Sequence, residues 1–165
     1  MKNLNIKKFT INFIIVFLIF LFDRVSKAYV INYFDSFSET QIMFNSFINI
    51  ILVWNSGIGF GLLSYQESSI YNLITAIIIF INLIIIYYIW KYEDIRSFFL
   101  SLILGGSLGN LFDRIYFSAV PDFIDLNYND FHWFIFNVAD IFITLGVLCL
   151  IFVELILNNL KKNNE

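Results

Sequence analysis

GGSLGNLFDRIYFSAVPDFID, residues 105–125, joins an apolar helical segment to several charged and amide side chains. A charged residue at the centre of a bilayer costs about 3 kcal/mol, so ionisable residues inside apolar helices usually have a function. The polar members of this stretch are Asn110, Asp113, Arg114, Asp122 and Asp125. They predict a site at one end of a membrane span.

The whole chain has the composition of an integral membrane protein. Of its 165 residues, 59% are hydrophobic and 14% are charged, whereas a soluble domain has about a quarter charged residues. Apolar runs of about 20 residues, long enough to cross a bilayer, recur along the sequence. They predict four spans, at 9–31, 70–90, 98–118 and 137–157. We expect an all-α integral membrane protein, with residues 1–165 in a single membrane-embedded domain.

The distribution of Lys and Arg predicts the orientation. Two loops, 32–69 and 119–136, contain no basic residue, so by the positive-inside rule they face outward and both termini are cytoplasmic. The loop between the first two spans carries the β-favouring stretch FINIILVW, so we expect a small extracytoplasmic β-rich loop there. The second loop is aromatic and is expected at the membrane interface. The basic residues on the cytoplasmic side are Lys2, Lys7, Lys8, Lys91, Arg96, Lys161 and Lys162.

Polar side chains from five separate segments converge at one depth, near the outer membrane surface. With a rise of about 1.5 Å per residue, Asp23 and Asn110 fall in the outer halves of their spans. The remaining members come from the outer loops and from the start of the fourth span: Asn55, Asp122, Asn137 and Asp140. This convergence predicts a site at the outer surface.

Helical spacing places several of these residues on shared faces. Asp23 and Lys27 are four residues apart and can pair. Gly105 and Gly109 form a small-xxx-small pattern that lets another helix approach closely. Two further groups have the spacing of a shared helix face: Asn110, Asp113 and Arg114, with Gly106 one turn before them, and Asn137 with Asp140. Gly106 is therefore counted with the site.

Structural ion pairs between helices are an equally good explanation for four of these residues: Asp23, Lys27, Asp113 and Arg114. Asp122 and Asp140 fit that explanation less well, because no spare basic residue is available to neutralise them. Two carboxyl groups held close in partly apolar surroundings have their pKa values pushed apart, so that one keeps a proton. An aspartic hydrolase needs this arrangement, with either carboxyl as the proton carrier.

Other classes of site are weaker fits. GGSLG, residues 105–109, matches the G-x-S-x-G nucleophile pattern but lacks a strand–turn–helix context, and His132 is the only histidine. One histidine and the single Cys149 argue against a zinc site, and we expect no metal or cofactor. No basic cluster with interleaved aromatic residues indicates nucleic-acid binding. A small transporter or a membrane scaffold stays an alternative, although no internal repeat is visible.

Five motifs, in order along the chain, resemble the bacterial lipoprotein signal peptidases, also called signal peptidase II. They are FDRVSKAYV at 22–30, NSGIGFG at 55–61, GGSLGNLFDR at 105–114, VPDFID at 120–125 and FNVAD at 136–140. The resemblance implies an aspartyl endopeptidase of the bacterial inner membrane. It would remove the signal peptide from diacylglyceryl-modified prolipoproteins by cutting before the lipidated cysteine, near the outer face.

The resemblance also implies roles for particular residues. Asp122 and Asp140 correspond to the catalytic pair of the family, and residues 32–69 to a small sheet that cradles the substrate. The implied partners are prolipoproteins and membrane lipids, with no cofactor or metal, and we expect a monomer. Asp125 is expected to be a solvated bystander. The supporting polar residues of the family correspond to Asp23, Lys27, Asn55, Asn110, Asp113, Arg114 and Asn137.

This sequence departs from the usual family pattern at four positions. Pro121 precedes Asp122, which biases residue 120 toward extended structure. The other departures are Gly59, Phe134 and Ile141. None of them removes a charged member of the pattern, so they concern loop geometry and substrate fit rather than chemistry.

Overall fold

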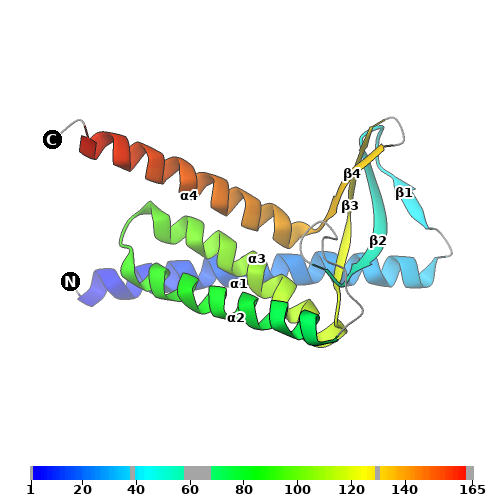
Figure 1. The fold of residues 1–165 in the computed structure, drawn as a ribbon, viewed down its shortest axis with the longest axis horizontal. Helices are drawn as coiled ribbons and strands as arrows, with labels where there is room; N and C mark the ends of the chain where they lie inside the picture. The colour runs from blue at the N-terminus through cyan, green and yellow to red at the C-terminus, as the bar shows by residue number, and fades with distance from the viewer. Residues whose placement is uncertain (1, 38–39, 58–67, 129–130, 163–165) are drawn as a thin grey trace.

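The computed structural model describes residues 2–37, 40–57, 68–128 and 131–162, and Figure 1 shows its fold. Four long helices form a bundle, and a small antiparallel sheet lies at one end of it. In chain order the elements are α1 (Lys2–Ser36), β1 (Gln41–Met43), β2 (Ile48–Asn55), α2 (Ser68–Lys91), α3 (Ile95–Phe117), β3 (Val120–Tyr128), β4 (Phe131–Phe136) and α4 (Val138–Lys162).

All four helices are long and apolar enough to cross a membrane, which confirms the expected four spans. The apolar segments within the described residues are Ile6–Ser36, Ile70–Lys91, Ile95–Phe117 and Val138–Leu157. Large apolar side chains cover the outer surface of the bundle, as lipid-facing helices require. This chain is therefore a multi-pass membrane protein.

The helix α3 is the centre of the bundle, and α1, α2 and α4 each pack against it. Its inward faces carry small residues that allow close approach. A Cβ atom on Gly106 would lie 2.5 Å from the carbonyl oxygen of Ala139 in α4, and one on Gly109 would lie 2.5 Å from the carboxylate of Asp23 in α1. Glycine at these two positions thus allows α4 and α1 to pack closely against α3.

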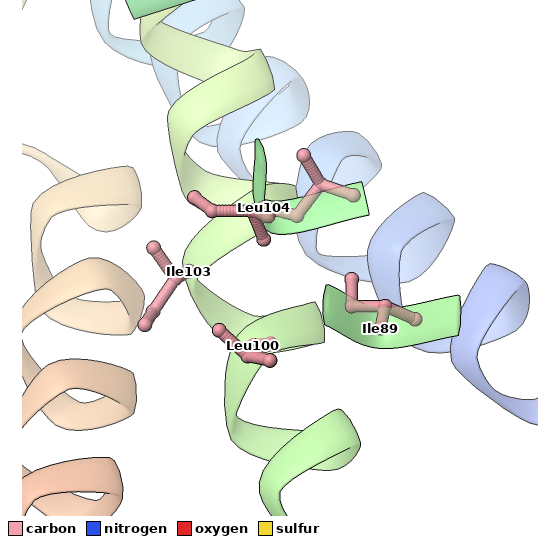
Figure 2. Close-up of a cluster of buried hydrophobic side chains, with 5 residues drawn as sticks. Ile89, Leu100, Ile103 and Leu104 are labelled. Atoms are coloured by element: carbon pink, nitrogen blue, oxygen red, sulfur yellow. The ribbon is translucent and has the colours of Figure 1, made fainter. Parts of the chain in front are cut away.

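Apolar packing fixes α2 against α3 at the end of the bundle away from the sheet. Ile89 of α2 belongs to one buried apolar cluster with Leu100, Ile103 and Leu104 of α3, and Figure 2 shows Ile103 on the side of α3 that faces α4. Asp94 starts α3 as its N-cap, accepting a hydrogen bond from the backbone N–H of Arg96 at 3.0 Å. The short link between these helices therefore holds them antiparallel.

The sheet has the order β1-β2-β3-β4, with every neighbouring pair antiparallel. Its first half lies between the first two spans, as expected. Its second half is a difference from the sequence prediction, because residues 119–136 were expected only as an interfacial loop. The β-favouring aromatic run FHWFIF forms β4, and it pairs with β3, which in turn covers the edge of β2.

Two element boundaries bear on the site. The helix α1 continues to Ser36, beyond the expected end at 31, and passes beside the sheet (Figure 1). The strand β3 starts at Val120, in agreement with the extended backbone expected before Pro121. A second apolar cluster of Val30, Phe123 and Val138 then joins α1, β3 and α4. Gly59 and Gly61 lie outside the described residues.

Candidate active site

A cavity of about 290 Å³ lies where the sheet meets the helix bundle. Six residues singled out from the sequence line it, and they come from β2, β3, α3 and the start of α4: Asn55, Asn110, Arg114, Asp122, Asn137 and Asp140. The sequence did not single out the other lining residues, which are Ile78, Ser107, Val120, Ile143 and Thr144. The structure thus brings together polar groups that are up to 85 positions apart in the sequence, from Asn55 to Asp140.

Asp122 enters this cavity from the start of β3. Its Oδ1 accepts a hydrogen bond of 2.6 Å from Asn137 Nδ2, and its Oδ2 accepts one of 2.9 Å from Asn55 Nδ2. Burial, reinforced by the negative charge of Asp140, raises the pKa of Asp122 to about 6, against the opposing effect of the two amide donors. No described cation pairs directly with this carboxylate.

Asp140 is held at the N-terminus of α4 by a reciprocal capping arrangement. Asn137 is the residue before the helix, and its Oδ1 accepts a hydrogen bond of 3.2 Å from the backbone N–H of Asp140. In return, Asp140 Oδ2 accepts one of 3.1 Å from the backbone N–H of Asn137. Asn110 Nδ2 donates to Asp140 Oδ1 at 2.8 Å. Because Asn137 also bonds Asp122, one side chain fixes both carboxyl groups.

A four-residue ion cluster lies directly behind the cavity. It contains two carboxylates and two cations, Asp23 and Asp113 with Arg24 and Lys27. Lys27 Nζ lies 3.0 Å from Asp23 and 2.7 Å from Asp113, and Arg24 bonds both carboxylates. Asp23, Lys27 and Asp113 are each at most 1% exposed. The cluster therefore has balanced charge and joins α1 to α3, which accords with the ion-pair interpretation of Asp23, Lys27 and Asp113 but does not extend to Arg114.

The cluster is connected to the carboxyl pair by two hydrogen-bond paths. Lys27 Nζ donates to Asn110 Oδ1 at 2.8 Å, and the same amide donates to Asp140. Asp23 Oδ1 accepts a bond of 3.1 Å from the backbone N–H of Ala139, in the first turn of α4. Gly106 allows α4 to reach this position. The cluster thus orients Asp140 without touching the cavity itself.

Arg114 belongs to the cavity wall rather than to the ion cluster. Its Nη2 donates to the carbonyl oxygen of Gly57, and its guanidinium lies 5.4 Å from the ring centre of Tyr71. Tyr71 also donates from its hydroxyl to the Arg114 carbonyl at 3.1 Å. Arg114 Nη1 is buried and has no hydrogen-bond partner among the described residues. Arg114 thus fixes the end of β2 and α2 around the cavity.

Arg24 is the residue that the sequence reasoning left without a role. It lies in the first span next to Asp23, and neighbouring helix positions point in different directions. Its guanidinium nevertheless bonds Asp113, 89 positions away, and lies 4.8 Å from the ring centre of Phe112. A signal was present, because Arg24 is one of only three basic residues that fall within or at the end of a predicted span.

The expectation for Asp125 was wrong. It is fully buried rather than solvated, because β3 is an inner strand and its neighbours cover the side chain. Asp125 Oδ2 lies 2.8 Å from His132 Nδ1 and accepts weaker bonds of 3.4 Å from Asn49 and Asn127. None of these four residues lines the cavity. Asp125 therefore stabilises the pairing of β2, β3 and β4.

Replacing Asp125 is expected to affect stability more than chemistry. Asp125→Asn should leave the chemistry of the cavity largely unchanged but lower the free energy of unfolding by about 1–3 kcal/mol, since it disturbs the buried contacts with Asn49, Asn127 and His132. Thermal unfolding in detergent would measure this loss. Asp35→Asn, at an exposed position of α1, is the control and should change stability by less than about 0.5 kcal/mol. An inactive but stable Asp125→Asn protein would contradict this assignment.

The raised pKa of Asp122 predicts a pH-dependent stability difference. The ordinary pKa of an aspartate carboxyl group is 3.8, and that of Asp122 in the folded protein is about 6. Below pH 3.8 the group contributes its full stabilisation to the folded state, and this stabilisation is lost as the pH rises through about 6. The unfolding free energy of the wild type relative to Asp122→Asn should therefore fall by about 2–3 kcal/mol over this interval. Unfolding of both proteins in detergent at several pH values would measure it.

Asp94 supplies a control of opposite sign. Hydrogen bonding from Arg96 lowers the pKa of Asp94, which lies in the link between α2 and α3. Its contribution is therefore present above its ordinary pKa and lost as pH falls. Wild type relative to Asp94→Asn should gain stability with rising pH, by a smaller amount because the side chain is 46% exposed. If the stability difference between wild type and Asp122→Asn changed with pH in the same direction as that between wild type and Asp94→Asn, the raised pKa would be wrongly assigned to Asp122.

The donor set of the described residues does not suit a transition metal. Among them, no group of three or more His, Cys, Asp or Glu side chains is arranged to hold a metal ion. Cys149 is a free cysteine within α4. The polar groups that line the cavity are two carboxyl groups, three amides, one guanidinium and the hydroxyl groups of Ser107 and Thr144.

Comparison with known proteins places this fold and cavity in a family. The model of the family described as signal peptidase (SPase) II matches residues 15–156. A lipoprotein signal peptidase of Pelagibacter ubique (strain HTCC1062) is 49% identical over 165 residues, covering 100% of this chain and 99% of that protein. The lipoprotein signal peptidase of Anaplasma marginale (strain Florida) is 38% identical over 143 residues, covering 86% of this chain and 82% of that one.

Solved structures share the fold. A structure described as a bacterial membrane enzyme matches with a TM-score of 0.72 and 32% identity, covering 91% of this chain and 90% of that chain. A second one with the same description matches with a TM-score of 0.61 and 28% identity, covering 88% and 92%. Because the family model extends over most of the chain and a relative matches along its whole length, this protein belongs to the signal peptidase II family, the lipoprotein signal peptidases.

Proposed function

We propose that this protein is an aspartic endopeptidase that removes the signal peptide from diacylglyceryl-modified prolipoproteins, cutting before the lipidated cysteine. The observation that carries the proposal is the placement of Asp122 and Asp140 in one cavity, held by amide donors and without a direct ion pair among the described residues. Family membership supplies the class of reaction and substrate. Six of the ten site residues inferred from the sequence line this cavity, and Asp23, Lys27 and Asp113 belong to the ion cluster that is hydrogen-bonded to Asn110 and Ala139.

In this mechanism Asp140 is the general base and Asp122 carries the proton. The N-terminus of a helix favours a negative charge, and Asp140 lies in the first turn of α4. Burial and the charge of Asp140 raise the pKa of Asp122, so this carboxyl group keeps its proton at a higher pH than a free carboxyl group does. Water attacks the scissile carbonyl carbon as its proton passes to Asp140, while Asp122 gives its proton to the carbonyl oxygen. The tetrahedral intermediate contains the new C–O bond.

The second half of the reaction restores both carboxyl groups. Asp140 transfers its proton to the amide nitrogen, the C–N bond breaks, and the new amine leaves on the lipidated product. Asp122 recovers its proton from the hydroxyl as the carboxylic acid forms. Asn55, Asn110 and Asn137 bond the two carboxyl groups and keep them in place, so that little reorganisation is needed during the reaction.

An apolar depression beside Asp140 is consistent with the proposal of a lipidated substrate. It has a volume of about 270 Å³ and is lined by Phe134, Phe136, Ile141 and Leu145, together with Thr144 and Asp140 itself. An acyl chain of the modified cysteine would bury its apolar surface here while the peptide bond lies in the carboxyl cavity. Phe134 and Ile141, which depart from the usual family pattern, would then set the fit of this chain.

We propose an orientation in the membrane that fits this reaction. Both termini are cytoplasmic and the sheet faces outward, so the cavity meets a precursor whose cysteine has reached the outer membrane surface. The protein works as a monomer, and residues 1–165 act as one membrane-embedded domain. Reaction with a membrane-impermeant thiol reagent in intact cells tests this orientation. With Cys149→Ser as background, a cysteine placed at exposed Met43 should react, and one placed at exposed Lys7 should not.

A cleavage assay tests the proposed activity. Purified protein in detergent is mixed with a precursor lipoprotein in two forms, with and without diacylglyceryl on its cysteine. Loss of the signal peptide from the lipidated form alone, followed by electrophoretic mobility and confirmed by the mass of the new N-terminus, is the expected result. A folded protein that leaves several lipidated precursors intact would contradict the proposal.

A further inference from the structure

A second recess lies between helices α1 and α2, and its lining shares no residue with the carboxyl cavity. The helices α1 and α2 both pack against α3 but make few contacts with one another. Between them is a groove of about 620 Å³, at the end that carries the N-terminus (Figure 1). Most of its lining is apolar, with walls from α1 and α2 and a floor from α3: Phe13, Val16, Leu83, Ile86, Leu104 and Leu108.

Asn12 is the polar exception in this apolar lining. The side chain is only 6% exposed, and its Nδ2 has no hydrogen-bond partner in the described part of the chain. Leaving a buried amide donor unpaired costs about 1–3 kcal/mol, so an acceptor supplied from the groove would stabilise the protein. The position of Asn12 therefore indicates a ligand that combines an apolar body with a hydrogen-bond acceptor.

A cation lies one helical turn from Asn12, toward the N-terminus. Lys8 and Asn12 are four residues apart on α1, which places them on one face about 6 Å apart along the axis. Lys8 Nζ lies 3.4 Å from the carbonyl oxygen of Trp90, which lines the groove. Lys91 follows in sequence, with its Nζ 6.0 Å from the ring centre of Tyr87. The groove thus has a positively charged mouth, then a donor, then an apolar interior.

We propose that this groove binds an anionic diacyl phospholipid. The phosphate lies at Lys8 and Lys91, an ester carbonyl accepts a hydrogen bond from Asn12, and one acyl chain runs along Val16 toward Leu108. The axial spacing of Lys8 and Asn12 matches the order of phosphate and ester carbonyls in a glycerophospholipid. A transmembrane helix fits less well, because its backbone carbonyls are already bonded and offer Asn12 no acceptor.

Native mass spectrometry of the full-length protein tests the proposal. The probes are phosphatidylglycerol and phosphatidylcholine with identical acyl chains. We expect one phosphatidylglycerol to bind in preference to phosphatidylcholine. Asn12→Leu should weaken binding of both lipids about fivefold, the equivalent of one hydrogen bond of about 1 kcal/mol. Lys8→Gln should weaken phosphatidylglycerol binding more than phosphatidylcholine binding, because the choline cation already offsets the phosphate charge in the second lipid.

Two matched controls separate this site from general effects of polarity and charge. Asn82 is also buried, with its amide atoms unpaired among the described residues, but it does not line the groove, so Asn82→Leu should not change lipid binding. Lys7 is exposed and precedes Lys8 on a different side of the helix, so Lys7→Gln should have a smaller effect than Lys8→Gln. In lipid-free detergent, Asn12→Leu should unfold at the same temperature as wild type or above it, which shows that the variant is folded.

Three results would overturn the proposal. One is equal binding of the two lipids by the wild type. Another is a folded Asn12→Leu protein that binds phosphatidylglycerol as tightly as the wild type. The third is a spectrum in which a second copy of the chain, and no lipid, is retained and is lost on Asn12→Leu substitution, since that would make the groove a protein interface. Because the readout is lipid binding, failure of this proposal is distinct from failure of the proposed peptidase activity.

Discussion

Asp122→Asn and Asp140→Asn are each expected to abolish cleavage of a lipidated precursor, with a loss of at least about 10³-fold in rate. Each change removes one half of the acid–base pair, and general acid–base catalysis alone contributes about 10²–10⁴-fold. The two losses should not add in the double variant, because the carboxyl groups act on the same transition state. Initial rates of signal-peptide release from purified proteins would measure this.

The geometry makes asparagine a mild structural change at both positions. Asp122 accepts hydrogen bonds from Asn137 and Asn55, and an amide oxygen can keep one of them. Asp140 has its helix-capping role shared with the Asn137 side chain. Both variants should therefore insert in the membrane and unfold cooperatively. Ser107→Ala changes another lining residue of the cavity without removing a carboxyl group, and it is the matched control that should stay active.

One outcome would contradict the proposed roles directly. If Asp122→Asn retained activity while Asp125→Asn lost it, the carboxyl pair would be wrongly assigned. Asp125 is a demanding comparison, since it is the more deeply buried of the two and lies three residues further along the same strand. Activity loss in Ser107→Ala equal to that in the Asp variants would show that any change in the cavity is disruptive.

Composition was sufficient to predict the four membrane spans of the bundle. The four spans follow from apolar runs of bilayer length, which no soluble fold would expose. Counting residues along each span also predicts a common depth for Asp23, Asn110 and Asp140, which stays a prediction. The prediction of the spans succeeds because a membrane constrains helix length before any side chain packs.

Features that depend on contacts between distant segments were not predictable in the same way. The strands β3 and β4 contain aromatic residues that suit a membrane interface as well as a sheet, and only pairing with β2 decides between the two. Asp125 is buried because Asn49 and His132 come from neighbouring strands. Arg24 gains its role from Asp113 on another helix. Local sequence patterns contain no information on such partners.

Lys27→Met is expected to be the most destabilising single change in the ion cluster, lowering the free energy of unfolding by about 3–5 kcal/mol. Methionine preserves most of the side-chain volume but removes the charge. Asp23 and Asp113 are both fully buried, and Arg24 alone would then have to neutralise them. Asn110 would lose the donor to its Oδ1. Unfolding of the purified protein in detergent, by heat or denaturant, would measure the loss.

Two comparisons distinguish a buried charge imbalance from the loss of an ordinary ion pair. Arg96 pairs with Asp94 and Glu154, whose side chains are 46% and 40% exposed, so Arg96→Met should cost only about 0–1 kcal/mol. Adding Asp113→Asn to Lys27→Met restores the balance of charge and should recover part of the lost stability, which a double-mutant cycle would quantify. If Lys27→Met were no less stable than Arg96→Met, the cluster would not hold α1 to α3. The double variant still lacks the hydrogen bond from Lys27 to Asn110, which bonds Asp140, so it should regain stability without regaining the full cleavage rate.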